Sequence, residues 1–144
     1  MEQFILDASV GAKWFFKEDC QKEAATFLER HKEGAIQIIV PERFYLEFAS
    51  VCWKRARKKL IKFKEAVKIF DDMVKLPLSR YPDIELVDVT LENAMIFGIS
   101  VYDALYISLA EVYVAPLVTA DKALYEKCRK RFNFIEYLGN IRLN

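Results

Sequence analysis

The sequence predicts an α/β protein with three layers, α/β/α, built around a central parallel sheet of about five strands. Short apolar runs alternate with longer helical patterns along the 144 residues, and the gaps between runs are long enough for the crossover helices that parallel strands need. Four glycines and four prolines are fewer than the roughly 12% that average usage gives. This scarcity argues against a linker or a turn-rich all-β fold, and the length fits one domain over residues 1–144.

Two strands and four helices are expected in the first half of the chain. The strands are the apolar run 4–6, which ends at Asp7, and the β-branched run 36–40, which Pro41 closes. The helices are expected over residues 8–17, 20–32, 42–59 and 62–75, with Gly34 ending the second and the Leu76-Pro77 pair ending the fourth.

Three further strands alternate with helices in the second half of the chain. They are expected over residues 84–87, 117–119 and 134–136. Thr90 is expected to cap a helix that runs to residue 97 and ends at Gly98. Ser100 is expected to begin a helix that runs to residue 114, and the last helix is expected over residues 122–131.

Composition excludes several function classes. The 22 basic and 21 acidic residues give a net charge of +1, which provides no overall field to steer a charged partner. Three cysteines without a C-x-x-C spacing are expected to be small buried side chains in a reducing compartment. No apolar stretch approaches the ~18 residues of a membrane span, and Asp7 comes too early for a signal peptide, so we expect a cytoplasmic protein with no membrane partner. His31 lies among charged residues, where a solvated position is expected, so a serine or cysteine triad lacks its usual base.

Four carboxylates stand alone in long stretches without other charges: Asp7, Glu47, Asp103 and Asp121. An ionised carboxylate in apolar surroundings is costly unless hydrogen bonds, a counter-charge or a metal ion compensate for it. Each also has a simpler structural interpretation. Asp7 and Asp121 follow strands and precede helices, where aspartate is a favoured N-cap. Asp103 nearly completes a capping box with Ser100, and Glu47 could form a surface ion pair one helical turn from Arg43.

The positions of the four acids in the predicted fold favour a shared site. In an open parallel sheet, ligands bind at the carboxyl ends of the strands, where the strand order reverses. Carboxylates that converge there, with Lys122 as the sole neighbouring cation, would repel one another. A hard divalent cation such as Mg²⁺ or Mn²⁺ relieves that repulsion, and Ser9 and Thr119 are expected to support it with hydroxyl groups. Such a site could hydrolyse a phosphodiester.

Four motifs resemble those of the PIN-domain ribonucleases, and most closely the VapC toxins of prokaryotic toxin-antitoxin pairs. They are LDAS over residues 6–9, VPERFYLEFA over 40–49, VYDALYISLA over 101–110 and LVTADKAL over 117–124. The resemblance covers nearly the whole chain and implies a PIN-like fold.

The resemblance also implies catalytic and metal-binding roles for Asp7, Glu47, Asp103 and Asp121, with Thr119 as the hydroxyl beside the last acid. Glu47 is preferred over Glu42, which lies in an exposed first turn where acids favour the helix dipole. Glu126 is the candidate for a further acidic position that many family members have. The implied activity is that of a Mg²⁺- or Mn²⁺-dependent endoribonuclease, which acts as a homodimer and is blocked by an antitoxin segment over its acidic groove.

Residues 54–64 contain seven cations and no acid. They suit either a solvated face or the phosphate backbone of RNA, and the candidate RNA contacts are Lys54, Arg57, Lys58, Lys59 and Lys62. Trp53, Tyr45 and Phe63 could stack bases, or could belong to the core or to a dimer surface.

Two other function classes stay open. A catalytically quiet PIN-like module would bind RNA or protein without cleaving it. A phospho-accepting signalling domain would need an aspartate at the end of the third strand and a lysine after a later strand, which Asp88 and Lys122 fit poorly.

Overall fold

The computed structural model describes residues 1–143, and within them five parallel strands form one sheet in the order β3-β2-β1-β4-β5. The predicted α/β fold with a parallel sheet is confirmed. The strands are β1 (Glu2–Leu6), β2 (Ile36–Pro41), β3 (Ser79–Tyr81), β4 (Leu117–Thr119) and β5 (Ile135–Tyr137).

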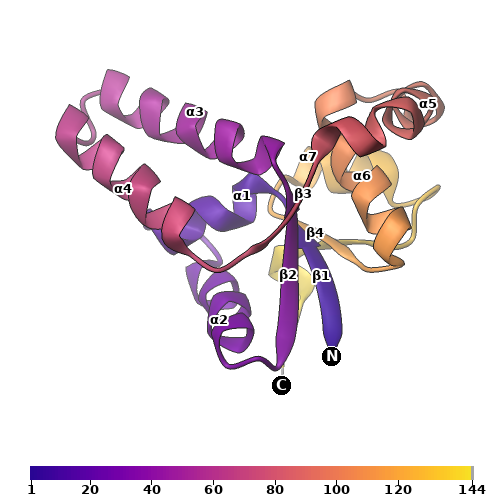
Figure 1. Ribbon diagram of the computed structural model, residues 1–144, viewed down its shortest axis with the longest axis horizontal. Coiled ribbons are helices and arrows are strands. Elements are labelled where there is room, and N and C mark those ends of the chain that lie inside the picture. The colour runs from indigo at the N-terminus through magenta and orange to yellow at the C-terminus, as the bar shows by residue number, and fades with distance from the viewer. Residues whose placement is uncertain (144) are drawn as a thin grey trace.

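Helices cover both faces of this sheet (Figure 1). On one face lie α1 (Ala8–Gly11), the 3₁₀ turn η1 (Ala12–Trp14), α2 (Gln21–Lys32), α3 (Arg43–Arg57) and α4 (Phe63–Lys75). On the other face lie the 3₁₀ turn η2 (Asp83–Leu86), α5 (Val87–Phe97), α6 (Val101–Tyr113) and α7 (Lys122–Cys128). The chain then passes through β5 into the last 3₁₀ turn, η3 (Leu138–Asn140).

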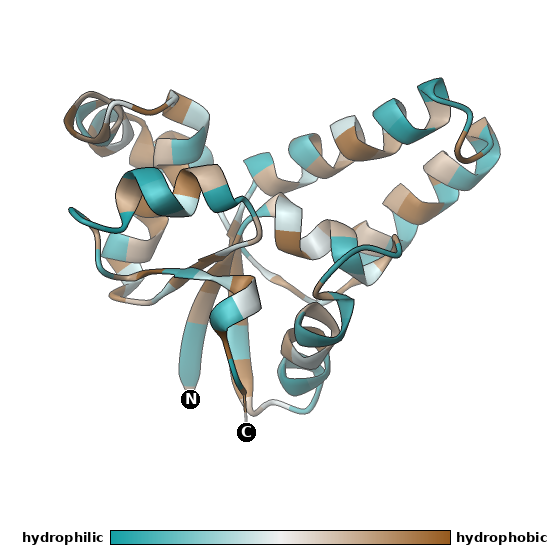
Figure 2. Cartoon of the chain, turned by 180° about the vertical axis from the view of Figure 1, so that it is seen from behind, coloured by the Kyte–Doolittle hydropathy of each residue, from teal (hydrophilic) through white to brown (hydrophobic). Residues whose placement is uncertain are grey.

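The two central strands are buried on both faces, which explains their unbroken apolar sequences. Phe4 and Leu6 of β1 pack with Phe48 in the core beneath α1–α4. Ile5, between them, packs with Ile107 of α6 in the core on the opposite face, because successive strand residues point to opposite sides. In Figure 2 the strands are largely brown, and teal residues lie mainly on the helices outside them. Burial of both strand faces is the pattern that parallel sheets require.

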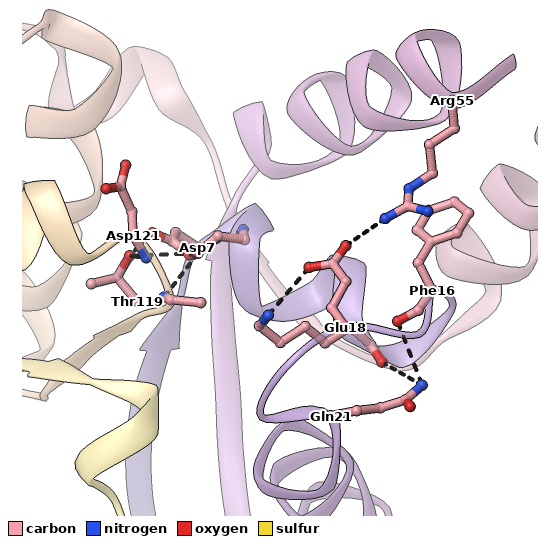
Figure 3. Close-up of polar contacts among 10 residues, drawn as sticks. Asp7, Phe16, Glu18, Gln21, Arg55, Thr119 and Asp121 are labelled. Carbon is pink, nitrogen blue, oxygen red and sulfur yellow. Dashed lines mark hydrogen bonds and ion pairs between the residues drawn. The ribbon is translucent and has the colours of Figure 1, made fainter. Parts of the chain in front are cut away.

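Helices α3 and α4 form a hairpin that projects beyond the sheet (Figures 1 and 2). Its turn includes Lys59, whose φ of 58° is in the left-handed region. An ion-pair network fixes the base of the hairpin: Glu18 accepts from Lys13 at 3.2 Å and from Arg55 of α3 at 2.8 Å, and Arg55 lies 4.2 Å from the ring centre of Phe16 (Figure 3). Arg55 is therefore a structural cation of the hairpin.

The strand order reverses at β1, which lies between β2 and β4. The chain moves outward from β1 through β2 to β3, then returns to the other side of β1 to add β4 and β5. Asp7 directly follows β1, and Asp121 follows β4 by two residues. The expected switch point therefore exists, and two of the singled-out acids lie at it.

The strand expected over residues 84–87 is wrong. Residues 83–86 form η2, and the third strand is the earlier segment Ser79–Tyr81. Ile84 is 79% exposed, and Leu86 is the buried residue of η2. An edge strand pairs on one side only, so β3 does not need an apolar sequence to form. A search for apolar runs therefore does not detect it.

Three helix boundaries and one histidine also differ from expectation. The first helix ends at Trp14 as α1 and η1, α5 starts at Val87 instead of Thr90, and α7 ends at Cys128 instead of residue 131. His31 is not a solvated side chain. Its Nδ1 accepts from the Ile38 N–H at 3.0 Å, and its Nε2 bonds the Pro77 carbonyl oxygen at 2.7 Å. The Ile38 N–H lies just before β3 begins to pair with β2, so the imidazole takes the place of a missing strand partner.

Within residues 1–143, no single helix is long and apolar enough to cross a membrane, although Asp83–Phe97 and Val101–Tyr113 pass such a test together across a 111° bend.

Candidate functional site

Asp7 is the buried carboxylate at the carboxyl end of β1, 7% exposed. One carboxylate oxygen, Oδ1, accepts from the backbone N–H of Ser9 at 3.1 Å and from the Ser9 hydroxyl. The other, Oδ2, accepts from the Thr119 hydroxyl at 2.5 Å (Figure 3). Asp7 is thus the N-cap of α1, as the simpler interpretation held. It is at the same time tied to β4, which capping does not require.

The two hydroxyl residues join the ends of β1 and β4 around Asp7. The Thr119 Oγ1 that donates to Asp7 also accepts from the Asp121 N–H at 3.0 Å. The Ser9 Oγ accepts from the Ala120 N–H at 2.9 Å. Each hydroxyl therefore has a fixed donor and acceptor role, and together they hold both oxygens of Asp7 in place.

Burial raises the pKa of Asp7 from 3.8 to about 6. The hydrogen bonds from Ser9 and Thr119 lower this pKa, whereas the negative charge of Glu47 raises it further. Desolvation is the largest of these effects because the ionised form loses water that the two hydroxyls only partly replace. A cation at Asp7 would supply the missing compensation.

Glu47 approaches Asp7 from the second turn of α3. Its Oε1 accepts from the Tyr106 hydroxyl of α6 at 2.5 Å. Burial raises the pKa of Glu47, the Tyr106 hydrogen bond and the Arg43 charge lower it, and the Asp103 charge raises it. The carboxylate therefore lies between two helices and within range of the charges of both neighbouring acids.

Asp103 and Asp121 complete the set from α6 and α7. Asp103 is in the first turn of α6, where its N–H donates to the Ser100 hydroxyl at 3.1 Å. Burial and the charge of Asp121 raise its pKa, and Lys127 lowers it. Asp121 is the N-cap of α7, with its Oδ1 accepting from the Leu124 N–H at 3.1 Å.

The four acids form a connected series, in which the charges of Asp7 and Glu47, Glu47 and Asp103, and Asp103 and Asp121 interact. The donor chemistry, carboxylate and hydroxyl oxygens, is what Mg²⁺ and Mn²⁺ prefer. Within residues 1–143, however, no group of three or more His, Cys, Asp or Glu side chains is close enough to hold a metal ion. Repulsion between carboxylates favours such spacing.

Glu42 and Glu126 lie outside this series, whereas the charge of Asp83 also raises the pKa of Glu47. The Glu42 side chain accepts from the Asp83 N–H at 3.1 Å, and the Asp83 carboxylate accepts from the Arg43 N–H at 3.2 Å, so the two acids bond the starts of η2 and α3. Glu126 lies on the exposed side of α7 and pairs with Arg129 at 3.5 Å. Glu47 is therefore better placed than Glu42 to take part in the site.

Tyr106 was not expected at the site, and the cations that face the acids differ from the expected one. Tyr106 bonds Glu47, and its position three residues after Asp103, on the same helical face, was an available signal. Arg43 and Lys127 are the cations that lower the pKa values of Glu47 and Asp103. The expectation that Lys122 was the sole neighbouring cation is wrong, because helical neighbours and not chain neighbours face these acids.

The candidate RNA contacts lie at the end of α3 and in the turn before α4. All are exposed, and none takes part in an ion pair among residues 1–143: Lys54, Arg57, Lys58, Lys59 and Lys62. Arg57 lies ten residues after Glu47 on the same helix, which is about 15 Å along its axis. These cations are therefore next to the acidic series and not part of it.

An open groove of about 710 Å³ runs along α3 and is lined by Glu47 of the acidic series and by Lys54 of the candidate cations. Ser9, Arg43 and Glu47 line one end, and Trp53 and Lys54 line the other. The Trp53 side chain is 58% exposed. A strand that lay in the groove would contact both the acidic and the basic residues.

The chain has a doubly wound parallel sheet with carboxylates at its switch point. It therefore belongs to the class of α/β proteins that bind their ligand at the carboxyl edge of the sheet. Its family is also clear, because the model of the PIN domain matches residues 4–130. The chain belongs to the PIN-domain family.

Known relatives agree with this family. Ribonuclease VapC3 of Pyrobaculum aerophilum is 28% identical over 127 residues, which cover 87% of this chain and 94% of the relative. Among solved structures, PAE2754 of P. aerophilum matches with a TM-score of 0.70 and 21% identity over 96% of this chain and 92% of its own.

Two further solved structures share the fold. VapC20 of Mycobacterium tuberculosis, described as a sarcin-ricin loop cleaving toxin, has a TM-score of 0.64 at 11% identity over 85% of this chain and 93% of its own. VapBC2 of Rickettsia felis, solved with a promoter DNA fragment, has a TM-score of 0.61 at 17% identity over 94% and 98% of the two chains.

Proposed function

We propose that this chain is an endoribonuclease, the toxin of a VapBC-type toxin-antitoxin pair. Membership of the PIN family over residues 4–130 and similarity to a VapC ribonuclease support the activity. The observation that carries it is the series of four interacting carboxylates at the switch point of the sheet.

In this proposal Asp7, Glu47, Asp103 and Asp121 are the catalytic acids and hold a Mg²⁺ or Mn²⁺ ion. PIN ribonucleases generally use a divalent metal, which supplies Lewis-acid activation of the phosphodiester and of the attacking water. Burial is the main reason that the pKa values of Asp7, Glu47 and Asp103 are raised, and the nearby hydrogen bonds and cations offset it only in part. A cation among them would draw the side chains together and keep them ionised.

The supporting residues act on the acids and not on the substrate. Ser9 and Thr119 hold the two oxygens of Asp7 by hydrogen bonds. Tyr106 holds one oxygen of Glu47 and leaves the other free to bind a ligand. Such fixed donors orient ligating oxygens and so reduce the entropy that a bound ion would otherwise cost.

The proposed partners are an RNA substrate, an antitoxin protein and a second copy of the chain. The exposed cations Lys54, Arg57, Lys58, Lys59 and Lys62 suit the RNA backbone. Exposed apolar side chains on α5, including Leu91 (53% exposed) and Met95 (70%), suit a homodimer surface. The antitoxin would cover the acidic groove.

We also propose that residues 1–144 are one domain and that the protein works in the cytoplasm.

Cleavage of labelled single-stranded RNA tests this function. The protein, freed of any bound partner, should cleave RNA when Mn²⁺ or Mg²⁺ is added and should stop when the metal is chelated. Asp103→Asn should abolish cleavage and preserve the circular dichroism spectrum, because Asp103 is exposed enough to tolerate an amide. If the unmutated protein shows no metal-stimulated cleavage, the chain is instead a quiet PIN module that binds RNA or protein.

A further inference from the structure

Arg43 has an unusual position at the mouth of the acidic site. It is the first residue of α3, and its backbone N–H donates to the Asp83 carboxylate at 3.2 Å. Its guanidinium carbon lies 3.8 Å from the ring centre of Tyr102, in the first turn of α6. The side chain therefore bridges the two helices that carry Glu47 and Asp103.

The charge of Arg43 lowers the pKa values of Glu47 and Asp83, but among residues 1–143 its guanidinium forms an ion pair with neither carboxylate. The Nε of Arg43 is buried without a hydrogen-bond partner in the part of the chain that the structure describes. A buried donor without an acceptor costs free energy that a ligand acceptor can recover. The cation–π contact with the Tyr102 ring holds the guanidinium at this position between the two helices.

The surroundings of Arg43 identify the acceptor. Arg43 lines the same groove as Ser9 and Glu47, and the groove continues to Lys54. Arg43 and Lys54 are eleven residues apart on α3, which is about 16 Å. Cations spaced along one groove suit a polyanion better than a single carboxylate. A guanidinium binds phosphate oxygens through two parallel hydrogen bonds.

We propose that Arg43, held on Tyr102, binds a backbone phosphate of the RNA strand that enters the acidic site. The proposal rests on the RNA substrate of the proposed function. In this proposal, the positive charge of Arg43 offsets part of the repulsion between the phosphates of the entering strand and the four carboxylates. Arg43 is thus a substrate-binding residue, distinct from the acids that would hold a metal.

The proposal is tested by the equilibrium binding of a fluorescein-labelled single-stranded RNA. An RNA of about a dozen nucleotides is within the range of site sizes of small domains that bind single strands. Fluorescence anisotropy is measured in EDTA across a series of KCl concentrations. Arg43→Lys keeps the charge but loses the planar fork, so the Kd should rise about tenfold with an unchanged salt slope. Arg43→Gln loses the charge as well, so the slope of log K against log salt should fall by about 0.7. Tyr102→Leu should weaken binding with an unchanged slope.

Arg80→Lys is the matched control. Arg80 also lies over a tyrosine ring, 4.5 Å from the ring centre of Tyr45, but does not line the groove. This variant should bind RNA as the unmutated protein does. Wild-type affinity and slope in both Arg43 variants would overturn the proposal, as would an equal loss in the Arg80 control.

The outcome is separable from that of the proposed function because binding is measured without metal. Metal-dependent cleavage combined with wild-type binding by the Arg43 variants would overturn this inference alone. Binding that depends on Arg43 in a protein that never cleaves RNA would sustain the inference and refute the nuclease.

Discussion

Replacement of Asp7 by asparagine should stabilise the metal-free protein at neutral pH. Burial raises the pKa of Asp7 from 3.8 to about 6, so the folded protein binds a proton more tightly than the unfolded chain does. The free energy of unfolding therefore falls as the pH rises from about 4 to about 6 and stays lower above that range. The difference of about 2 pKa units corresponds to about 3 kcal/mol. Asp7→Asn removes this penalty, and about 3 kcal/mol is the upper limit of the gain because the amide satisfies the two hydroxyls less well.

Urea unfolding of both proteins in EDTA, at pH 4 and at pH 7.5, measures this difference. The variant should be more stable at pH 7.5 and should lose that advantage at pH 4, where Asp7 is protonated in the folded protein. Added Mn²⁺ should reverse the order at pH 7.5, because an ion at a thousand times its Kd stabilises the protein that binds it by about 4.1 kcal/mol, which exceeds the upper limit of the gain from Asp7→Asn. A difference between the two proteins that does not change with pH would refute the reasoning.

Two further variants test other parts of the site. Tyr106→Phe removes the hydroxyl that bonds Glu47 and should lower Mn²⁺ affinity about tenfold by titration calorimetry, with little change in melting temperature; an unchanged affinity would leave Tyr106 as a core residue only. Lys58→Glu combined with Lys59→Glu should weaken RNA binding and flatten its salt dependence, while Lys32→Glu on α2 should change neither. If Lys32→Glu had the same effect as the Lys58→Glu and Lys59→Glu combination, Lys58 and Lys59 would be solvated surface residues without a specific role in RNA binding.

The strands with the clearest sequence signal are those whose side chains are buried on both faces. β1, β2 and β4 lie in the interior of the sheet, and their apolar runs mark them without ambiguity. β3 is an edge strand that pairs with β2. The sequence of β3 is polar, whereas the residues of η2 that follow it include apolar side chains. Because apolar runs usually indicate strands, the third strand was predicted at η2.

The acids of the site were predictable because isolated charges in apolar stretches need compensation. The sequence could also place Asp7 and Asp121 as N-caps, since that geometry depends on neighbouring residues. The positions of Tyr106 and Arg43 depend on the packing of α3 against α6, which joins residues 59 positions apart. The local pattern can place Tyr106 on the same face of α6 as Asp103, but it does not encode the contacts between α6 and α3. The imidazole of His31 is a similar case, because its partners come from β2 and from Pro77, two residues before β3.

The most direct test of the account is the anomalous difference map of a crystal soaked in Mn²⁺. The account predicts a peak among Asp7, Glu47, Asp103 and Asp121, with carboxylate oxygens as ligands at roughly 2.0–2.3 Å. A map without a peak among these four side chains, from a protein that still cleaves RNA with Mn²⁺, would contradict it.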